Sequence, residues 1–154
     1  MQAAEPTDLT TWHKRFAIDA NNRAWDLAEA QRTPAQDREM LDAAHASAWH
    51  WSAIGTELNN MRASMLLAEV HAQLGHGVSA FEFAREMHAY FTTHESPDWE
   101  IAFAHAIYAH AANLAGAHAV YFRAYETATR AIQAIARDED REIVMKTFSK
   151  VPRP

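Results

Sequence analysis

The chain has 154 residues and a formal net charge of −6, with acidic and basic residues mixed along its whole length. It has no cysteine, which excludes a disulfide framework, a thiolate zinc site and a thiol nucleophile. It has no basic run that could neutralise a phosphate backbone, so we expect no nucleic-acid partner. Thirty-three alanines stand against 4 glycines and 5 prolines, which favours an all-α protein because alanine has the best helix propensity and the other two the worst.

The segment 1–9 is polar and acidic and lacks the apolar core of a signal peptide. No apolar run approaches the roughly 20 residues that are needed to span a bilayer. We therefore expect a cytoplasmic protein that does not engage a membrane.

Apolar periodicity predicts seven helices, at about residues 8–31, 34–54, 56–74, 78–94, 97–115, 117–137 and 138–150. Thr33 with Gln36 predicts a capping box at the start of the second helix. Ser96, which precedes a proline, predicts a capped start for the fifth helix. Gly75 and Gly116 are expected to end the third and fifth helices. The last residues, 151–154, are expected to fray.

The first helix has apolar residues on two sides. The main face, which we expect to pack inside the domain, is formed by Leu9, Trp12, Phe16, Ala20 and Leu27. A second stripe, formed by Ile18 and Trp25, lies on the opposite side. A helix that is apolar on both sides is either sandwiched inside its domain or meets another chain. Ile18 and Trp25 are therefore candidates for self-association as a homodimer.

Two stretches of the chain align at an offset of 41 residues, namely 62–81 and 103–122. In each, an apolar-periodic helix ends at a glycine and a second helix starts a few residues later. Such short turns require neighbouring helices to be antiparallel. We expect one domain, 1–154, with hairpins at about 8–54, 56–95 and 97–137 and a capping helix at about 138–150.

The repeated segments resemble the tetratricopeptide repeat. The residues that carry the resemblance are Leu67-Ala68, His71, Leu74-Gly75 and Ala80 in the first copy, and Tyr108-Ala109 and Ala115-Gly116 in the second. More specifically, residues 43–141 resemble a group of uncharacterised bacterial tetratricopeptide-like proteins, through Ala44-His45-Ala46-Ser47, His50-Trp51, Ile54-Gly55-Thr56, Asp98-Trp99-Glu100-Ile101-Ala102-Phe103-Ala104 and Asp140-Arg141-Glu142. The resemblance implies a right-handed array of helical hairpins that serves as a scaffold, and it brings no catalytic residues.

The resemblance also implies that the first helix of each hairpin lines a concave groove. The groove positions are Arg62, Met65, Glu69 and Gln73 in the third helix and Phe103, His110 and Asn113 in the fifth. A mixture of polar side chains with methionine and phenylalanine is suited to an extended peptide or a partner helix. The leading hypothesis is therefore a non-enzymatic scaffold that binds a peptide or protein and needs no cofactor.

Two alternatives stay open. One is a sensor domain that binds a small ligand between hairpins, lined by His45, Trp51 and His105. The other is a metal-dependent enzyme with histidine ligands from several helices. No two of the ten histidines are three or four residues apart, so no single helix offers a pair of histidine ligands. Only Asp42 and His45 share a helix face at spacing three, and we expect no metal site. His45 is the histidine that we expect to be buried. Trp49 and Trp51, two residues apart, are not both expected to be buried.

Overall fold

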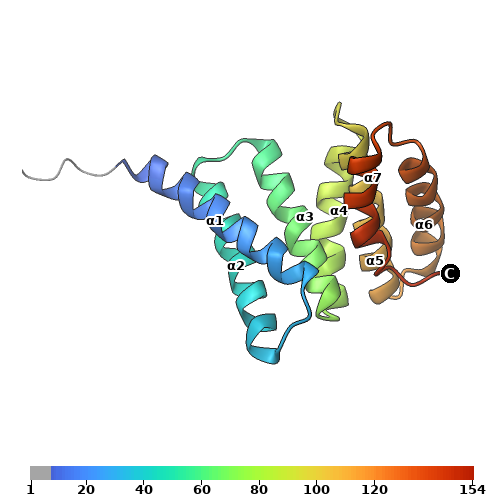
Figure 1. The fold of residues 1–154 in the computed structure, drawn as a ribbon, viewed down its shortest axis with the longest axis horizontal. Coiled ribbons are helices and arrows are strands. Elements are labelled where there is room, and N and C mark those ends of the chain that lie inside the picture. The colour runs from blue at the N-terminus through green and yellow to red at the C-terminus, as the bar shows by residue number, and fades with distance from the viewer. Residues whose placement is uncertain (1–7) are drawn as a thin grey trace, which may run out of the picture.

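The computed structural model describes residues 8–154, and within them the chain is all-α (Figure 1). Its seven helices are α1 (Leu9–Glu29), α2 (Pro34–Ile54), α3 (Glu57–Gln73), α4 (Gly77–Phe91), α5 (Asp98–Leu114), α6 (His118–Gln133) and α7 (Asp138–Phe148). Several end two to four residues earlier than the sequence pattern predicts, as frayed last turns commonly do. The predicted domain also includes residues 1–7, which lie outside the described residues.

Consecutive helices pack as antiparallel pairs, α1 with α2, α3 with α4 and α5 with α6. The odd-numbered helices also meet one another, because α3 contacts both α1 and α5, and α5 contacts α7. The larger hydrophobic core is formed by the five helices from α3 through α7. A smaller core is formed by α1, α2 and α3. None of the seven helices in residues 8–154 combines the length and the apolar character that crossing a membrane requires.

The helix starts confirm one sequence prediction and correct another. Thr33 accepts a hydrogen bond from the Gln36 backbone N–H at 3.3 Å, and the Gln36 side chain accepts one from the Thr33 N–H at 2.9 Å, which is the predicted capping box. The prediction that Ser96 caps α5 is wrong. Pro97 holds the cap position instead, and the Ser96 hydroxyl donates to the His94 carbonyl at 3.3 Å.

Gly75 and Gly116 end α3 and α5 as predicted, with φ angles of +78° and +77°. This left-handed conformation strains a residue that has a Cβ atom, so glycine is the residue suited to both turns. Gly77 serves a different purpose. A Cβ atom there would lie 2.5 Å from the Leu114 carbonyl oxygen, so the glycine permits the start of α4 to approach the end of α5.

The expected inward face of α1 is wrong for its three largest members. Leu9 is 72% exposed, Trp12 39% and Phe16 46%, while the buried residues of α1 are Ala17, Ala24, Leu27 and Ala28. Alanines allow helix backbones to approach closely, so α1 packs through its small side chains and leaves the large rings outside.

Residues 151–154 were predicted to fray, and this prediction is wrong, because the chain is held against the helices there. Val151 is only 4% exposed, and the Tyr121 hydroxyl donates to the Pro152 carbonyl. The Lys150 ammonium donates to the Ala28 carbonyl at 2.5 Å, which ties the segment after α7 to the last turn of α1. This contact closes one end of the layer formed by the odd-numbered helices.

Candidate functional site

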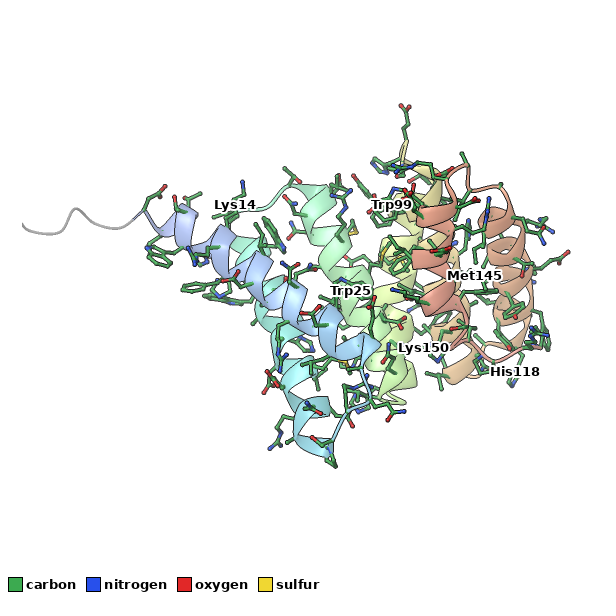
Figure 2. All side chains as sticks on the ribbon, in the orientation of Figure 1. Lys14, Trp25, Trp99, His118, Met145 and Lys150 are labelled. Carbon is green, nitrogen blue, oxygen red and sulfur yellow. The ribbon has the colours of Figure 1, made fainter. Side chains whose placement is uncertain are left out.

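A pocket of about 490 Å³ lies where the four odd-numbered helices meet. We call it the groove pocket. It is lined by Asn21, Trp25 and Glu29 of α1, Arg62 and Met65 of α3, Trp99, Glu100 and Phe103 of α5, and Ile143 and Thr147 of α7. Figure 2 is viewed from the side on which α1 and α7 lie in front, and it labels Trp25 and Trp99. Three of the residues expected to line a groove, Arg62, Met65 and Phe103, line this pocket.

Aromatic and sulfur-containing side chains form the apolar part of the groove pocket. The Trp25 ring centroid lies 5.4 Å from that of Phe103 at an interplanar angle of 56°, so α1 and α5 touch across α3. Met65 and Phe103 are 4% and 8% exposed and form the floor, while Trp25 and Trp99 are half-buried at the walls. Broad, rigid aromatic surfaces of this kind anchor apolar side chains of a partner at little conformational cost.

An ion pair marks the polar part of the pocket. The Arg62 guanidinium donates from Nε and a terminal nitrogen to the two Glu100 carboxylate oxygens, at 2.8 and 2.9 Å. Glu100 is 3% exposed whereas the Arg62 side chain is 45% exposed. The hydrogen bond with Glu100 raises the pKa of Arg62. The pair therefore gives the buried Glu100 side chain two hydrogen bonds and presents the outer edge of the guanidinium to the pocket.

A second group of polar side chains lies between the loop after α1, the helices α3 and α5, and the segment after α7. We call it the Glu69 cluster, and its members are Arg32, Glu69, Gln73, His110 and Lys150. The Gln73 side-chain amide donates to Glu69 Oε1 at 2.8 Å, and its oxygen accepts from Arg32 at 2.9 Å. Arg32 also donates to Asp37 at 2.7 Å and to the Leu27 carbonyl at 2.9 Å. The cluster links the loop after α1 to α3.

Two atoms of the cluster are buried without a hydrogen-bond partner, Glu69 Oε2 and His110 Nδ1. Burial raises the pKa of Glu69, and the hydrogen bond from Gln73 together with the positive charges of Lys150 and Arg32 offsets only part of that effect. Burial, with a smaller contribution from Lys150, lowers the pKa of His110 to about 4. Both groups are thus driven toward their neutral forms, in which the protonated carboxyl is a donor and the neutral imidazole carries one acceptor nitrogen.

The structure separates the sequence-predicted groove residues into two sets. Arg62, Met65 and Phe103 line the groove pocket. Glu69, Gln73 and His110 belong to the Glu69 cluster, with Glu69 fully buried, and Asn113 is half-buried near the end of α5. Lys150, in the segment after α7, lies close enough to Glu69 and His110 for its charge to act on both, and it also donates to the Ala28 carbonyl. No local sequence pattern signals the contact between residues 28 and 150.

The two residues predicted for self-association lie apart. Trp25 lines the groove pocket against Phe103, whereas Ile18 is 40% exposed on the surface. Trp49 is 64% exposed and Trp51 half-buried, which confirms that they are not both buried.

Histidines contact one another between helices, a feature that spacing along one helix cannot show. His45 Nε2 lies 3.1 Å from His71 Nε2, and the other nitrogen of His71 lies 3.0 Å from His76 Nδ1. His45 is exposed, so the expectation that it is buried is wrong. Burial, with smaller contributions from His45 and His76, lowers the pKa of His71 to about 4.

A second such pair joins α4 to α5, where His88 Nε2 lies 3.0 Å from His105 Nδ1. Burial and the neighbouring His105 lower the pKa of His88 to about 4. His45 and His105, two of the residues named for a ligand site, therefore lie in separate pairs, and neither lines the groove pocket. Across residues 8–154, no group of three or more metal-ligating side chains is placed to hold an ion.

Comparison of the chain with protein-family models, with curated proteins and with solved structures finds no match.

Proposed function

We propose that this chain is a non-enzymatic scaffold, built as a right-handed tetratricopeptide-like array, whose groove pocket binds an extended peptide or a helix of a partner protein. The observation that carries the proposal is the convergence of α1, α3, α5 and α7 on one pocket lined by Trp25, Trp99 and Phe103. Aromatic side chains at the centre of an interface commonly supply most of its binding energy.

The equivalence of the two hairpin turns supports the array. The Gly75 and Gly116 N–H groups each donate to the residue three positions earlier, at 3.1 Å in both turns. The next residues, His76 and Ala117, each donate to the residue five positions earlier, at 2.9 Å in both. The two turns are separated by the 41-residue offset seen in the sequence, so the same local geometry recurs at equivalent positions of both copies.

The lining of the groove pocket indicates the chemistry of the partner. An apolar side chain would insert between Trp25, Met65 and Phe103. Glu29 lies at the rim and forms no ion pair among residues 8–154. A lysine or arginine placed next to the apolar anchor would pair with Glu29, so we expect partners with an apolar residue followed closely by a basic one.

Peptide selection from a random display library, using the purified chain as bait, tests this function. Ile143 is 53% exposed and lines the groove pocket, whereas Met145, on the same helix and 41% exposed, does not. Ile143→Glu should weaken binding of a selected peptide at least tenfold, and Met145→Glu should leave it unchanged. Equal effects of the two variants, or no selectable peptide, would contradict the proposal.

A small ligand in the same pocket is a second candidate, because about 490 Å³ lies within the range of small-molecule sites. A screen of metabolites by thermal melting distinguishes the two candidates. A metabolite that raises the melting temperature of the chain and of Met145→Glu, but not of Ile143→Glu, would favour the sensor function. The scaffold function expects a rise from selected peptides only.

A further inference from the structure

The outer face of the α1/α2 hairpin carries a contiguous cluster of exposed rings. Trp12 stacks on Phe16 with ring centroids 5.4 Å apart, and Phe16 lies 5.5 Å from His50. His13 lies 5.6 Å from Trp49 and 5.1 Å from His50, which closes the cluster. Leu9, at 72% exposed, extends the cluster toward the start of α1. Single exposed apolar residues are ordinary, but a contiguous patch of this kind marks an interaction surface.

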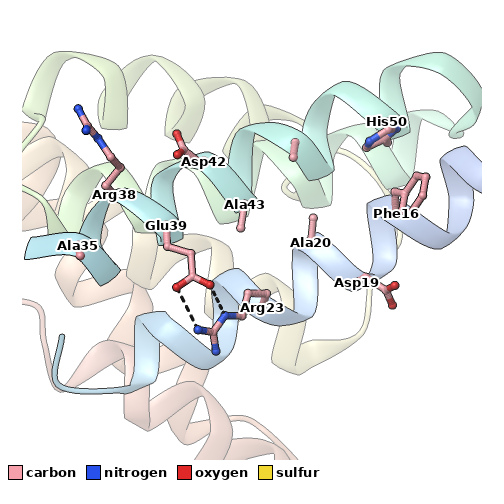
Figure 3. A pocket seen from close by; sticks show the side chains of 11 residues that line it. Phe16, Asp19, Ala20, Arg23, Ala35, Arg38, Glu39, Asp42, Ala43 and His50 are labelled. Carbon is pink, nitrogen blue, oxygen red and sulfur yellow. Dashed lines mark hydrogen bonds and ion pairs between the residues drawn. The ribbon is translucent and has the colours of Figure 1, made fainter. Parts of the chain in front are cut away.

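A hollow of about 700 Å³ continues from these rings along the same two helices. Beyond Phe16 and His50 it is lined by four alanines and by charged side chains of both signs. Figure 3 shows Ala20, Ala35 and Ala43 among them. The far end of the hollow is crossed by the ion pair between Arg23 and Glu39, 2.8 Å long, which Figure 3 shows spanning the two helices. The hollow is lined by α1 and α2 alone. We call the rings and the hollow together the end face.

The end face carries exposed rings at one end and a hollow, partly lined by alanines, at the other. A two-fold axis between two copies would set the rings of each against the hollow of the other, so both halves would be filled at once. A self-complementary patch is what an isologous dimer requires.

The charges around the hollow are complementary to a copy as well. None of the ion pairs in residues 8–154 involves Arg38 or Asp42, which both line the hollow. One free positive and one free negative group on the same patch can pair with the opposite groups of a second copy. The hollow is lined by three acidic and two basic side chains, so groups of both signs are present on this face for contacts with a copy.

We propose that two copies of this chain associate through their end faces, around a two-fold axis that seats the Trp12, Phe16 and Trp49 rings of each copy in the hollow of the other. This dimer uses the side of α1 opposite to Ile18. It leaves both groove pockets open, so it would present two binding grooves in one assembly and strengthen the capture of a partner with two anchor segments.

Sedimentation equilibrium of the purified chain tests the dimer, with matched charge variants on the two sides of α1. Phe16 and Ile18 are 46% and 40% exposed, so glutamate at either position should leave folding intact, which circular dichroism verifies. We expect a dimer of about 35 kDa, twice the 17.4 kDa of one chain. Phe16→Glu should raise the dissociation constant at least a hundredfold, and Ile18→Glu should raise it less than threefold. A wild-type monomer at about 100 µM, or equal effects of the two variants, would overturn the proposal.

Complementation tests the two-fold arrangement separately. Trp49→Ala removes a ring, and Ala43→Phe fills the hollow, so each variant alone should dimerise poorly. A mixed dimer holds one copy of each variant. In it, the native Trp49 of the Ala43→Phe copy faces a native hollow, and the added phenylalanine faces the site that Trp49→Ala has vacated. Native mass spectrometry should therefore show the mixed dimer in excess over both homodimers. A statistical mixture, or monomers only, would exclude the proposed arrangement.

Discussion

The helix α1 contributes an aromatic residue to each of two different surfaces. On one side Trp25 packs against Phe103 over a floor of buried side chains, and the pocket there is walled by four helices. On the other side Phe16 is 46% exposed, beside a hollow lined by α1 and α2 alone. The groove pocket is thus built by tertiary packing, whereas the end face is the outer side of one hairpin. We expect the groove pocket to be coupled to folding and the end face to be nearly independent of it.

Phenylalanine truncation gives the largest contrast between the two surfaces. Phe103→Ala deletes a ring that is 8% exposed and should lower the free energy of unfolding by about 3–5 kcal/mol. Phe16→Ala deletes a ring on the end face, and in dilute protein it should cost less than about 1 kcal/mol. Urea unfolding measures both values. Similar costs would mean that the end face is part of the folded core.

Arginine truncation should give a smaller contrast of the same kind. Arg62→Ala leaves the buried Glu100 carboxylate without its partner, and we expect a loss of about 2 kcal/mol. That value is below the cost for a fully buried pair because Arg62 is itself 45% exposed. Arg23→Ala breaks a pair whose members are both about half-exposed, so its effect on stability should be too small to resolve. Equal losses of stability in the two variants would mean that the burial of Glu100 does not strengthen the contribution of its ion pair with Arg62.

The Glu69 cluster should make the stability of the groove side depend on pH. Because burial raises the pKa of Glu69, the folded chain keeps this proton at pH values where the unfolded chain, with its ordinary value of 4.5, has lost it. The free energy of unfolding therefore falls as pH rises above 4.5 toward the raised pKa, by up to about 1.4 kcal/mol per pH unit.

His110 acts in the opposite direction. Its pKa of about 4 in the folded chain lies below the ordinary value of 6.5, so the unfolded chain binds the proton first and stability falls as pH drops from 6.5 to 4. Glu69→Gln should remove the loss on the alkaline side and leave the loss on the acidic side. Urea unfolding from pH 4 to 8 tests this, and identical pH profiles for the variant and the wild type would contradict the assigned ionisation of Glu69.

Helix capping should give the smallest contrast between two matched variants. Thr33→Ala removes the capping box of α2 and should cost about 1 kcal/mol. Ser96→Ala should change stability by less than about 0.5 kcal/mol, because Ser96 does not cap α5. Thermal melting of the two variants distinguishes a cap from a serine that only precedes a proline, and a larger loss at Ser96 would restore the original interpretation.

Local patterns in the sequence predicted the helices well. The all-α class, the seven helices and the turns at Gly75 and Gly116 follow from alanine content, apolar periodicity and glycine positions, all of which act over a few residues. The Thr33 capping box is equally local. Ser96 shows the limit, because a serine before a proline has the right composition for a cap but its hydroxyl donates to His94 instead.

The faces of the helices were harder to predict, because they depend on what packs against them. Apolar periodicity placed Trp12 and Phe16 inside, but the buried face of α1 is made mostly of alanine, which contributes little to such a pattern. Glu69 was expected on a groove surface and is fully buried, in a cluster whose members come from parts of the chain as distant as Arg32 and Lys150. The histidine contacts join different helices, so only a tertiary structure shows them.

The five tryptophans offer the most direct test of the central claim that the groove pocket is the binding site. Trp25 and Trp99 line the groove pocket, whereas Trp12 and Trp49 lie on the end face, so their indole N–H signals in a ¹⁵N-correlated NMR spectrum report the two surfaces separately. Addition of a selected peptide should shift the Trp25 and Trp99 signals and leave those of Trp12 and Trp49 in place. Shifts confined to Trp12 and Trp49 would contradict the account and assign partner binding to the end face.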